Sequence, residues 1–280
     1  MAQARGDAGL SQADLDVVHR VVDAFATRDA DAMWALAGER FEFHSTLAAL
    51  EGERGVYTSR ADVDRYFADL DDVFADWQIR DHVCVDAGDG CVVLVYRIAG
   101  HGRGSGVPLE HDFGILWRLR DAKLVSGETH ADPDDALEAA GIRRDLGAET
   151  RLLQDYGAAV EAGQFDRIRE MLHPDAVWEH NLGSGSPEEG VYEGRDRIAV
   201  LFQRIVEVWE YLRPTARDVV PIEGDGYRVR GELHSKHRFT AAEVVTPYEQ
   251  QIEVRDGLLF RARMSIGEGL IGSVERARAE

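Results

Sequence analysis

The sequence predicts an α+β protein that consists of two tandem copies of one domain. One observation is an internal repeat, in which GVYTSRADVDRYF at residues 55–67 returns as GVYEGRDRIAVLF at residues 190–202. The other is the order of hydrophobic periods in each copy, which is helical first and alternates between apolar and polar residues afterwards. Three helices followed by strands are typical of an α+β layer arrangement, in which a curved, mainly antiparallel sheet wraps its helices.

The repeat is long enough for each copy to be a domain, since the repeats of solenoids are much shorter. Its offset is 135 residues, as between Asp31 and Asp166, with a drift to 136 in places. The matches at 136 are Gly88-Asp89-Gly90 with residues 224–226, His44 with His180, and His101 with His237. The polar, glycine-containing segment after residue 133 favours a linker. We therefore predict domains at 10–141 and 146–270.

Each copy begins with an amphipathic helix, which in the first copy carries an apolar stripe from Val17 to Phe25 and has Ser11 as a candidate N-cap. The remaining elements expected in the first copy are helices at 32–37 and 61–74 and strands at 40–44, 78–87, 90–101, 109–120 and 123–131. Those expected in the second copy are helices at 148–162, 166–172 and 196–209 and strands at 176–180, 214–222, 226–239, 243–255 and 258–267.

Alternation along a strand assigns side chains to the faces of the sheet. In the strand 226–239, the apolar residues Tyr227, Val229, Leu233 and Phe239 alternate with charged residues. His237 falls on the apolar, inward face, and the offset of 136 transfers this placement to His101. The other face of the strand 90–101 would then hold Val92, Leu94, Tyr96 and Ile98. An apolar outer face needs a cover, which a homodimer or an intrachain pseudo-dimer would supply.

Composition narrows the classes of function. The chain has 280 residues, 44% of them hydrophobic, and a net charge of −20, which argues against nucleic acid and anionic membrane surfaces as partners. There is no apolar run long enough for a transmembrane helix and no signal peptide at the start, so a cytoplasmic protein is expected. Cys84 and Cys91 flank a turn in a geometry unsuited to a disulfide, and we expect no bound metal.

The element order and two motifs resemble a known superfamily. LHPDAVWEHN at residues 172–181 and the GVYxxR starts of both third helices are similar to segments of the nuclear transport factor 2-like superfamily, which includes ketosteroid isomerase and the SnoaL-like polyketide cyclases. The resemblance implies two tandem cone-like α+β barrel domains, each with three helices packed in its curved sheet. It also implies an apolar pocket on the concave face, where acid/base chemistry proceeds without a cofactor.

The resemblance places a base at the end of the first strand, where this sequence has His44 and His180. Strand alternation adds His101 and His237, and His111 through the apolar residues that follow it. The candidate catalytic residues are His44, His101, His111, His180 and His237. The candidate ligand-binding residues are Tyr57, Tyr192, Trp117, Tyr227 and Tyr248. Histidines on an inner face can equally serve the packing, so a structural hydrogen bond is the alternative role.

Paired imidazoles suit proton transfer near neutral pH. We expect a cofactor-independent acid/base enzyme, an isomerase, lyase or cyclase, that acts on a small apolar or polyketide-like carbonyl compound. The alternative is a non-catalytic module of the same fold that binds a small molecule or a protein, because this fold supports many activities.

Overall fold

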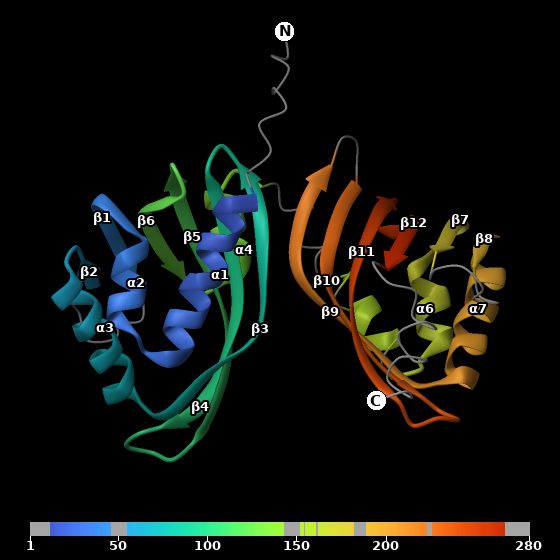
Figure 1. The fold of residues 1–280 in the computed structure, drawn as a ribbon, viewed down its shortest axis with the longest axis horizontal. Coiled ribbons are helices and arrows are strands. Elements are labelled where there is room, and N and C mark those ends of the chain that lie inside the picture. Colours follow the sequence, from blue (N-terminus) through green and yellow to red (C-terminus); the bar gives the residue numbers. More distant parts are fainter. Residues whose placement is uncertain are drawn as a thin grey trace, which may run out of the picture. The chain divides into compact units, whose positions relative to one another are not determined.

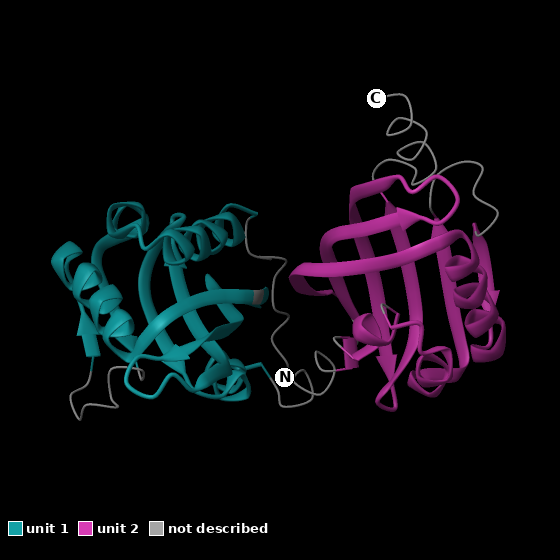
Figure 2. Cartoon of the chain, turned by 90° about the horizontal axis from the view of Figure 1, so that it is seen from below, with its two compact units in different colours: residues 1–144 teal, residues 145–280 magenta. Residues whose placement is uncertain are grey.

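The computed structural model describes residues 12–45, 55–142, 152–153, 155–160, 162–181, 189–222 and 226–266. The chain divides into two compact units, Met1–Arg144 and Asp145–Glu280 (Figure 2). Ser11 and residues 148–151, 154 and 161 of the expected helix 148–162 lie outside the described residues. None of the helices in the described part of the chain has the length and apolar character needed to span a membrane.

The first unit wraps a six-stranded sheet around its helices (Figure 1). The strand order is β2-β1-β6-β5-β4-β3, and the pairs are antiparallel except for β1 with β6. Its elements are α1 (Gln12–Thr27), α2 (Ala30–Leu36), β1 (Ala37–Ser45), β2 (Gly55–Tyr57), α3 (Arg60–Val73), β3 (Phe74–Gly88), β4 (Cys91–Gly102), β5 (Pro108–Arg120), β6 (Lys123–His130) and α4 (Pro133–Ala139).

The second unit repeats this plan with the order β9-β10-β11-β12-β7-β8, in which β7 and β12 are parallel. Its elements are α6 (Phe165–Met171), β7 (Leu172–Asn181), β8 (Gly190–Glu193), α7 (Arg195–Val208), β9 (Trp209–Ile222), β10 (Gly226–His237), β11 (Glu243–Arg255) and β12 (Leu258–Ile266). Residues 155–160 are helical as well. The two units thus have the tandem α+β architecture predicted from the sequence.

The strands of the two units are related by an offset of 135 residues throughout. Leu94 pairs with Ile115 in the first unit, and Val229 pairs with Gln250 in the second. His44 pairs with Glu128, and the equivalent pair is Glu179 with Arg263. The offset of 136 used above for the histidines was therefore wrong by one residue, and in a strand such a slip moves a side chain to the opposite face.

This register corrects the predicted faces of β4. The residues expected outside, Val92, Leu94, Tyr96 and Ile98, are the inner ones, and three of them line the interior beneath α1 and α3. The apolar face of β4, for which the sequence led us to expect a homodimer or a pseudo-dimer as cover, is thus covered within the first unit.

The convex face of the first unit has its own cover, which the sequence did not predict. The segment expected as part of a linker forms α4, which starts with Asp132 as N-cap and Pro133 in the first turn. Ala136 and Leu137 of α4 are buried. A Cβ at Gly114 of β5 would lie 2.6 Å from that of Ala136, so the glycine allows the helix to pack directly on the sheet.

Candidate functional site

His44 does not lie inside the first unit, contrary to the prediction. In β1, Phe41, Phe43 and Ser45 are buried, and His44 points to the other side with 48% of its side chain exposed. Its Nε2 lies 3.5 Å from Oε2 of Glu42, a neighbour on the same outer face. The residue that occupies the predicted inner position is Ser45, which forms a hydrogen bond with Tyr66 of α3.

His101 is also on the outer face, with 51% of its side chain exposed. Its backbone N–H donates to Oδ1 of Asp76 at 2.8 Å, and its Nδ1 lies 2.9 Å from the same oxygen. The hydrogen bond from His101 lowers the pKa of Asp76. The prediction that His44 and His101 converge in one pocket is therefore wrong.

His111 lies on the predicted face of β5 but at its exposed end. Its ring contacts that of Phe113, with 4.6 Å between the centroids, and its Nε2 lies 2.8 Å from the carbonyl oxygen of Ala131. The imidazole is thus held at the rim of the first unit by a backbone contact.

The interior of the first unit is filled by side chains. Trp117 is fully buried and stacks on Phe43 and Phe41, with centroid distances of 5.4 Å and 6.5 Å. The space among α1, α3 and the sheet has a volume of about 10 Å³, room for about one water molecule. Its lining residues are Phe25, Tyr66, Leu70, Trp77, Ile79, Leu94, Tyr96, Ile98 and Ile115. Trp117 therefore serves the core rather than a ligand in this conformation.

Tyr57 has a structural partner as well. It is buried, and its hydroxyl donates to Oδ2 of Asp69 at 3.0 Å. Burial, followed by the contact with Asp69, raises its pKa. Its counterpart Tyr192, opposite Trp178 in the β7–β8 pair, is half-buried.

In the second unit, His237 sits at the end of β10 and is held by the turn that follows. Its Nδ1 accepts a hydrogen bond from the backbone N–H of Thr240 at 3.2 Å, and its ring contacts those of Trp209 and Phe239. Phe239, predicted to be buried, is 76% exposed. Val229 is the β10 residue in the same row as His180. It lies eight residues before His237, a distance of about 26 Å along the strand. His180 and His237 therefore do not form a pair.

Of the five predicted catalytic histidines, His180 is the one that is buried, and it lies on the concave face of the second unit. It is 6% exposed and alternates in β7 with Trp178 and Ala176, which are both buried. β7 pairs with β12 and β12 with β11, so His180, Met264 and Gln250 follow one another across the sheet. This row, together with Val229 of β10, crosses the concave face of the second unit.

Several polar groups lie on the same face as this row, most of them on β11. The side chain of Gln250 is buried and forms a hydrogen bond with the hydroxyl of Tyr156, which comes from the first helical segment of the unit. Tyr248 lies two residues before Gln250 on the same face, and burial raises its pKa to about 12. Within the described residues, the buried Oγ1 of Thr246, next along this face, has no hydrogen-bond partner. Tyr227, a predicted ligand-binding residue, is buried on this face too.

The same positions in the first unit are occupied by other residues. Ser45, Thr129, Ile115 and Leu94 stand where the second unit has His180, Met264, Gln250 and Val229. Tyr96 and Trp117 of the first unit correspond to the smaller residues Gly231 and Ile252. The concave face of the second unit is thus more polar and carries smaller side chains in its centre.

The basic stripe on the other face of β10 is neutralised by its neighbour. Arg228 and Arg230 both contact Glu249 of β11, at 3.4 Å and 3.0 Å. Lys236 lies 3.2 Å from Glu210 and 3.9 Å from Glu243. Cross-strand ion pairs of this kind are a better account of the stripe than an anion site.

Sequence reasoning missed Gln250, Tyr156 and Thr246. The alternation that placed Tyr248 inside also runs through Thr246 and Gln250, so a polar residue in an otherwise apolar stripe was the available signal. Tyr156 could not be found in this way, because its contact with Gln250 joins a helix and a strand far apart in the chain.

Comparisons with known proteins agree with this architecture. The profile of the SnoaL-like domain matches twice, at residues 18–127 and 153–262, which are 135 residues apart at both ends. No curated protein is matched.

Several solved structures match one unit's length of this chain at low identity. An NTF2-like protein of unknown function from Burkholderia pseudomallei K96243 has 16% identity and a TM-score of 0.39, covering 45% of this chain and 95% of its own. IdmH of Streptomyces antibioticus, a candidate polyketide cyclase, has 17% identity and a TM-score of 0.40, and the match covers 47% of this chain and 98% of IdmH. A Catenulispora acidiphila protein with a ketosteroid isomerase-like fold, in complex with trimethylamine, has 15% identity and a TM-score of 0.37. The match covers 46% of this chain and 95% of that protein. Because the family profile covers most of both units, the chain belongs to the SnoaL-like domain family and contains two tandem copies of the domain.

Proposed function

We propose that the second unit binds a small carbonyl compound on its concave face and catalyses proton transfer on it, with His180 as the acid/base group. The observation that carries this proposal is that the two units have different side chains at equivalent positions of their concave faces. The concave face of the second unit carries a buried imidazole on β7 and the polar side chains of Gln250, Tyr248 and Thr246 on β11, where the first unit has Ser45 and an interior filled by aromatic rings.

The chemistry assigns a role to each group. The imidazole of His180 removes a proton from the carbon beside the carbonyl group, and the hydroxyl of Tyr248 donates a hydrogen bond to the oxygen that becomes negative. Burial keeps Tyr248 protonated, since its pKa is raised to about 12. His180 and Tyr248 stand two strands and two residues apart on the same face, with about 12 Å between their backbones.

The fate of the enolate defines the reaction class. Return of the proton to another carbon is an isomerisation, loss of a neighbouring hydroxyl group is a dehydration, and attack on a second carbonyl group is a cyclisation. The apolar residues of the same face, Trp178, Ile252 and Tyr227, suit a polyketide-like or otherwise largely apolar skeleton.

The test uses a reaction common to all three classes. The full chain is incubated in D₂O with 2-tetralone, and NMR follows the exchange of the protons beside the carbonyl group. We expect exchange faster than in buffer, and a decrease of about 10²–10⁴-fold in His180→Asn, the usual contribution of a positioned general base. His44→Asn is the matched control and should leave the rate unchanged, because His44 is exposed on the convex face.

An exchange rate in His180→Asn equal to that of the wild type would refute the acid/base role. Binding of 2-tetralone that Tyr248→Phe weakens, without any acceleration of exchange, would instead support the non-catalytic binding module.

A further inference from the structure

Thr246 lies on the concave face of the second unit, near the start of β11. It stands two residues before Tyr248 and four before Gln250, and side chains at such even intervals along a strand share one face. Its pairing partner on β10 is Leu233, which is also buried. Thr246 thus belongs to the face that we propose binds the substrate.

The hydroxyl group of Thr246 is buried without a hydrogen bond. The residue is 2% exposed, and within the described residues its Oγ1 has no partner. A hydroxyl group that leaves water without a compensating hydrogen bond destabilises the folded state. Buried polar groups in proteins nearly always have a partner, and a ligand can supply the one that is missing here.

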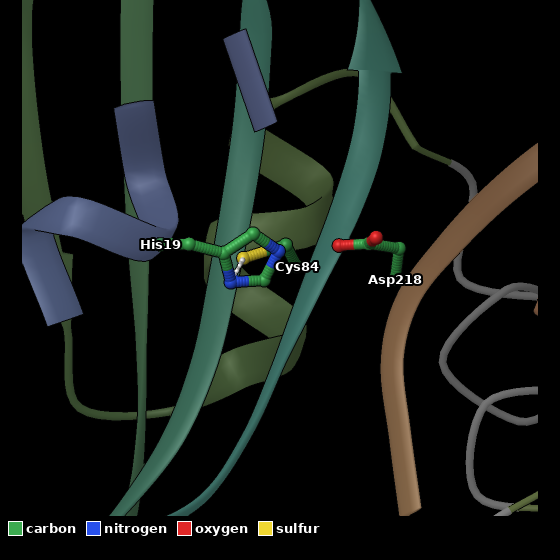
Figure 3. Close-up of side chains that lie close together, drawn as sticks. All are labelled: His19, Cys84 and Asp218. Atoms are coloured by element: carbon green, nitrogen blue, oxygen red, sulfur yellow. Dashed lines mark hydrogen bonds between the residues drawn. The ribbon is translucent and has the colours of Figure 1, made fainter. Parts of the chain in front are cut away.

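Other buried polar side chains show the usual arrangement. In the first unit, His19 and Cys84 contact each other, with 3.8 Å between Nδ1 and Sγ (Figure 3). In the second unit, Ser235 lies two residues from Leu233 on β10, and its hydroxyl donates to the carbonyl oxygen of Val244 at 3.1 Å. A partner from the protein itself is therefore available to a hydroxyl close to Thr246, which has none within the described residues.

The repeat supplies an internal comparison. His111 pairs with Ile98 in the first unit as Thr246 pairs with Leu233 in the second. Nε2 of His111 lies 2.8 Å from the carbonyl oxygen of Ala131. The protein thus supplies a partner for the polar group at this position in the first unit, whereas in the described part of the second unit the hydroxyl has none.

We propose that Thr246 forms a hydrogen bond with a second oxygen atom of the substrate, so that the substrate is a carbonyl compound with a further hydroxyl or carbonyl group. This inference rests on the function proposed above, in which Tyr248 contacts the reacting carbonyl group. The backbones of Thr246 and Tyr248 are about 7 Å apart along β11, which suits two oxygens at opposite ends of a fused pair of rings. A threonine hydroxyl both donates and accepts, so it can bind either group.

The test compares ligands that differ in one substituent. Derivatives of 2-tetralone carry either a hydroxyl group or a methyl group, which are similar in size, at position 6 or at position 7 of the aromatic ring. Equilibrium dialysis with the full chain gives their dissociation constants. For one of the two positions, we expect the wild type to bind the hydroxyl derivative about tenfold more tightly than its methyl counterpart, since only the hydroxyl derivative gives Thr246 a hydrogen bond.

Two variants of Thr246 isolate the contribution of its hydroxyl group. Thr246→Val removes the hydroxyl at nearly the same shape and should abolish the preference, whereas Thr246→Ser keeps the hydroxyl and should keep the preference. Thr129→Val is the matched control. It removes another buried hydroxyl without a partner, but from the first unit, whose interior is filled by side chains, and it should leave the preference unchanged.

Thermal unfolding of the ligand-free protein gives a second measurement. Because Thr246→Val removes a buried hydroxyl that has no partner, the variant should unfold at the temperature of the wild type or above it. A lower unfolding temperature would mean that the hydroxyl has a structural partner, and it would overturn the proposal.

Equal affinities of the wild type for hydroxyl and methyl derivatives at both positions, or a preference that persists in Thr246→Val, would overturn the proposal as well. The affinities do not depend on catalysis. A hydroxyl preference without accelerated proton exchange would therefore support this inference and refute the acid/base role of His180, and accelerated exchange without the preference would do the reverse.

Discussion

At the scale of single residues, Gly127 shows how the first unit accommodates its tryptophan. It pairs with Trp117 across β5 and β6, and a Cβ at residue 127 would lie 2.3 Å from the ring of Trp117. The second unit has Ala262 opposite Ile252 at the same positions. The larger side chain in β5 thus requires the smaller one in β6, and the two residues must change together.

We therefore expect Gly127→Ala alone to lower the free energy of unfolding by about 1–3 kcal/mol, the usual effect of overpacking. In the double variant Gly127→Ala with Trp117→Ile, the alanine should be tolerated better, since the ring it would clash with is gone. Urea unfolding of the wild type, both single variants and the double variant gives the coupling energy. Strict additivity would show that the contact does not limit the packing.

At the scale of elements, α3 has a cap that its counterpart lacks. The side chain of Ser59 accepts a hydrogen bond from the N–H of Asp62, whose carboxylate accepts from the N–H of Ser59. In the second unit, α7 starts after Gly194, which has a φ of 83° and no side chain to cap the helix. The two helices therefore begin differently although their lengths agree.

Ser59→Ala should lower the free energy of unfolding of the first unit by about 1 kcal/mol, the typical value of a lost N-cap. Hydrogen bonds from Thr58 and Ser59 lower the pKa of Asp62, so its contribution is present above the ordinary carboxyl pKa and is lost as pH falls through the lowered value. Chemical unfolding at neutral and acidic pH measures both effects. If Ser59→Ala left the stability unchanged at neutral pH, the cap would have no energetic role.

The elements themselves were largely predictable from the sequence, and their faces were not. Hydrophobic period and repeat located the helices and strands, because those signals are local. The predicted face of His101 depended on the choice between offsets of 135 and 136, and a one-residue error inverts a strand. The inward position of His44 came from the resemblance alone, and Ser45 occupies that position instead. α4 was hidden in a polar segment, since its buried face is formed by little more than Ala136 and Leu137.

At the scale of the whole molecule, buried tyrosines should govern stability in alkali. Burial raises the pKa of Tyr248 to about 12, whereas an exposed tyrosine in the unfolded chain titrates near about 10. The unfolded state then loses its proton first, so stability is complete below about pH 10 and falls between about 10 and 12. The fall is at most about 1.4 kcal/mol per pH unit for one such group.

Tyr248→Phe should reduce this slope, because phenylalanine has no proton to lose. Urea unfolding of the wild type and of the variant, repeated from about pH 8 to 11, provides the comparison. Equal slopes for the two proteins would mean that Tyr248 ionises as readily in the folded state as in the unfolded one.

The central claim is that the two units have diverged, so that the second binds a ligand on its concave face and the first is closed. Trp117 and Trp178 are buried on the concave faces of the first and second unit, and each indole N–H gives its own NMR signal. With the signals assigned by Trp→Phe variants, the full chain is titrated with 2-tetralone. We predict that the signal of Trp178 shifts and that of Trp117 does not, and a shift of Trp117 with Trp178 unchanged would contradict the account.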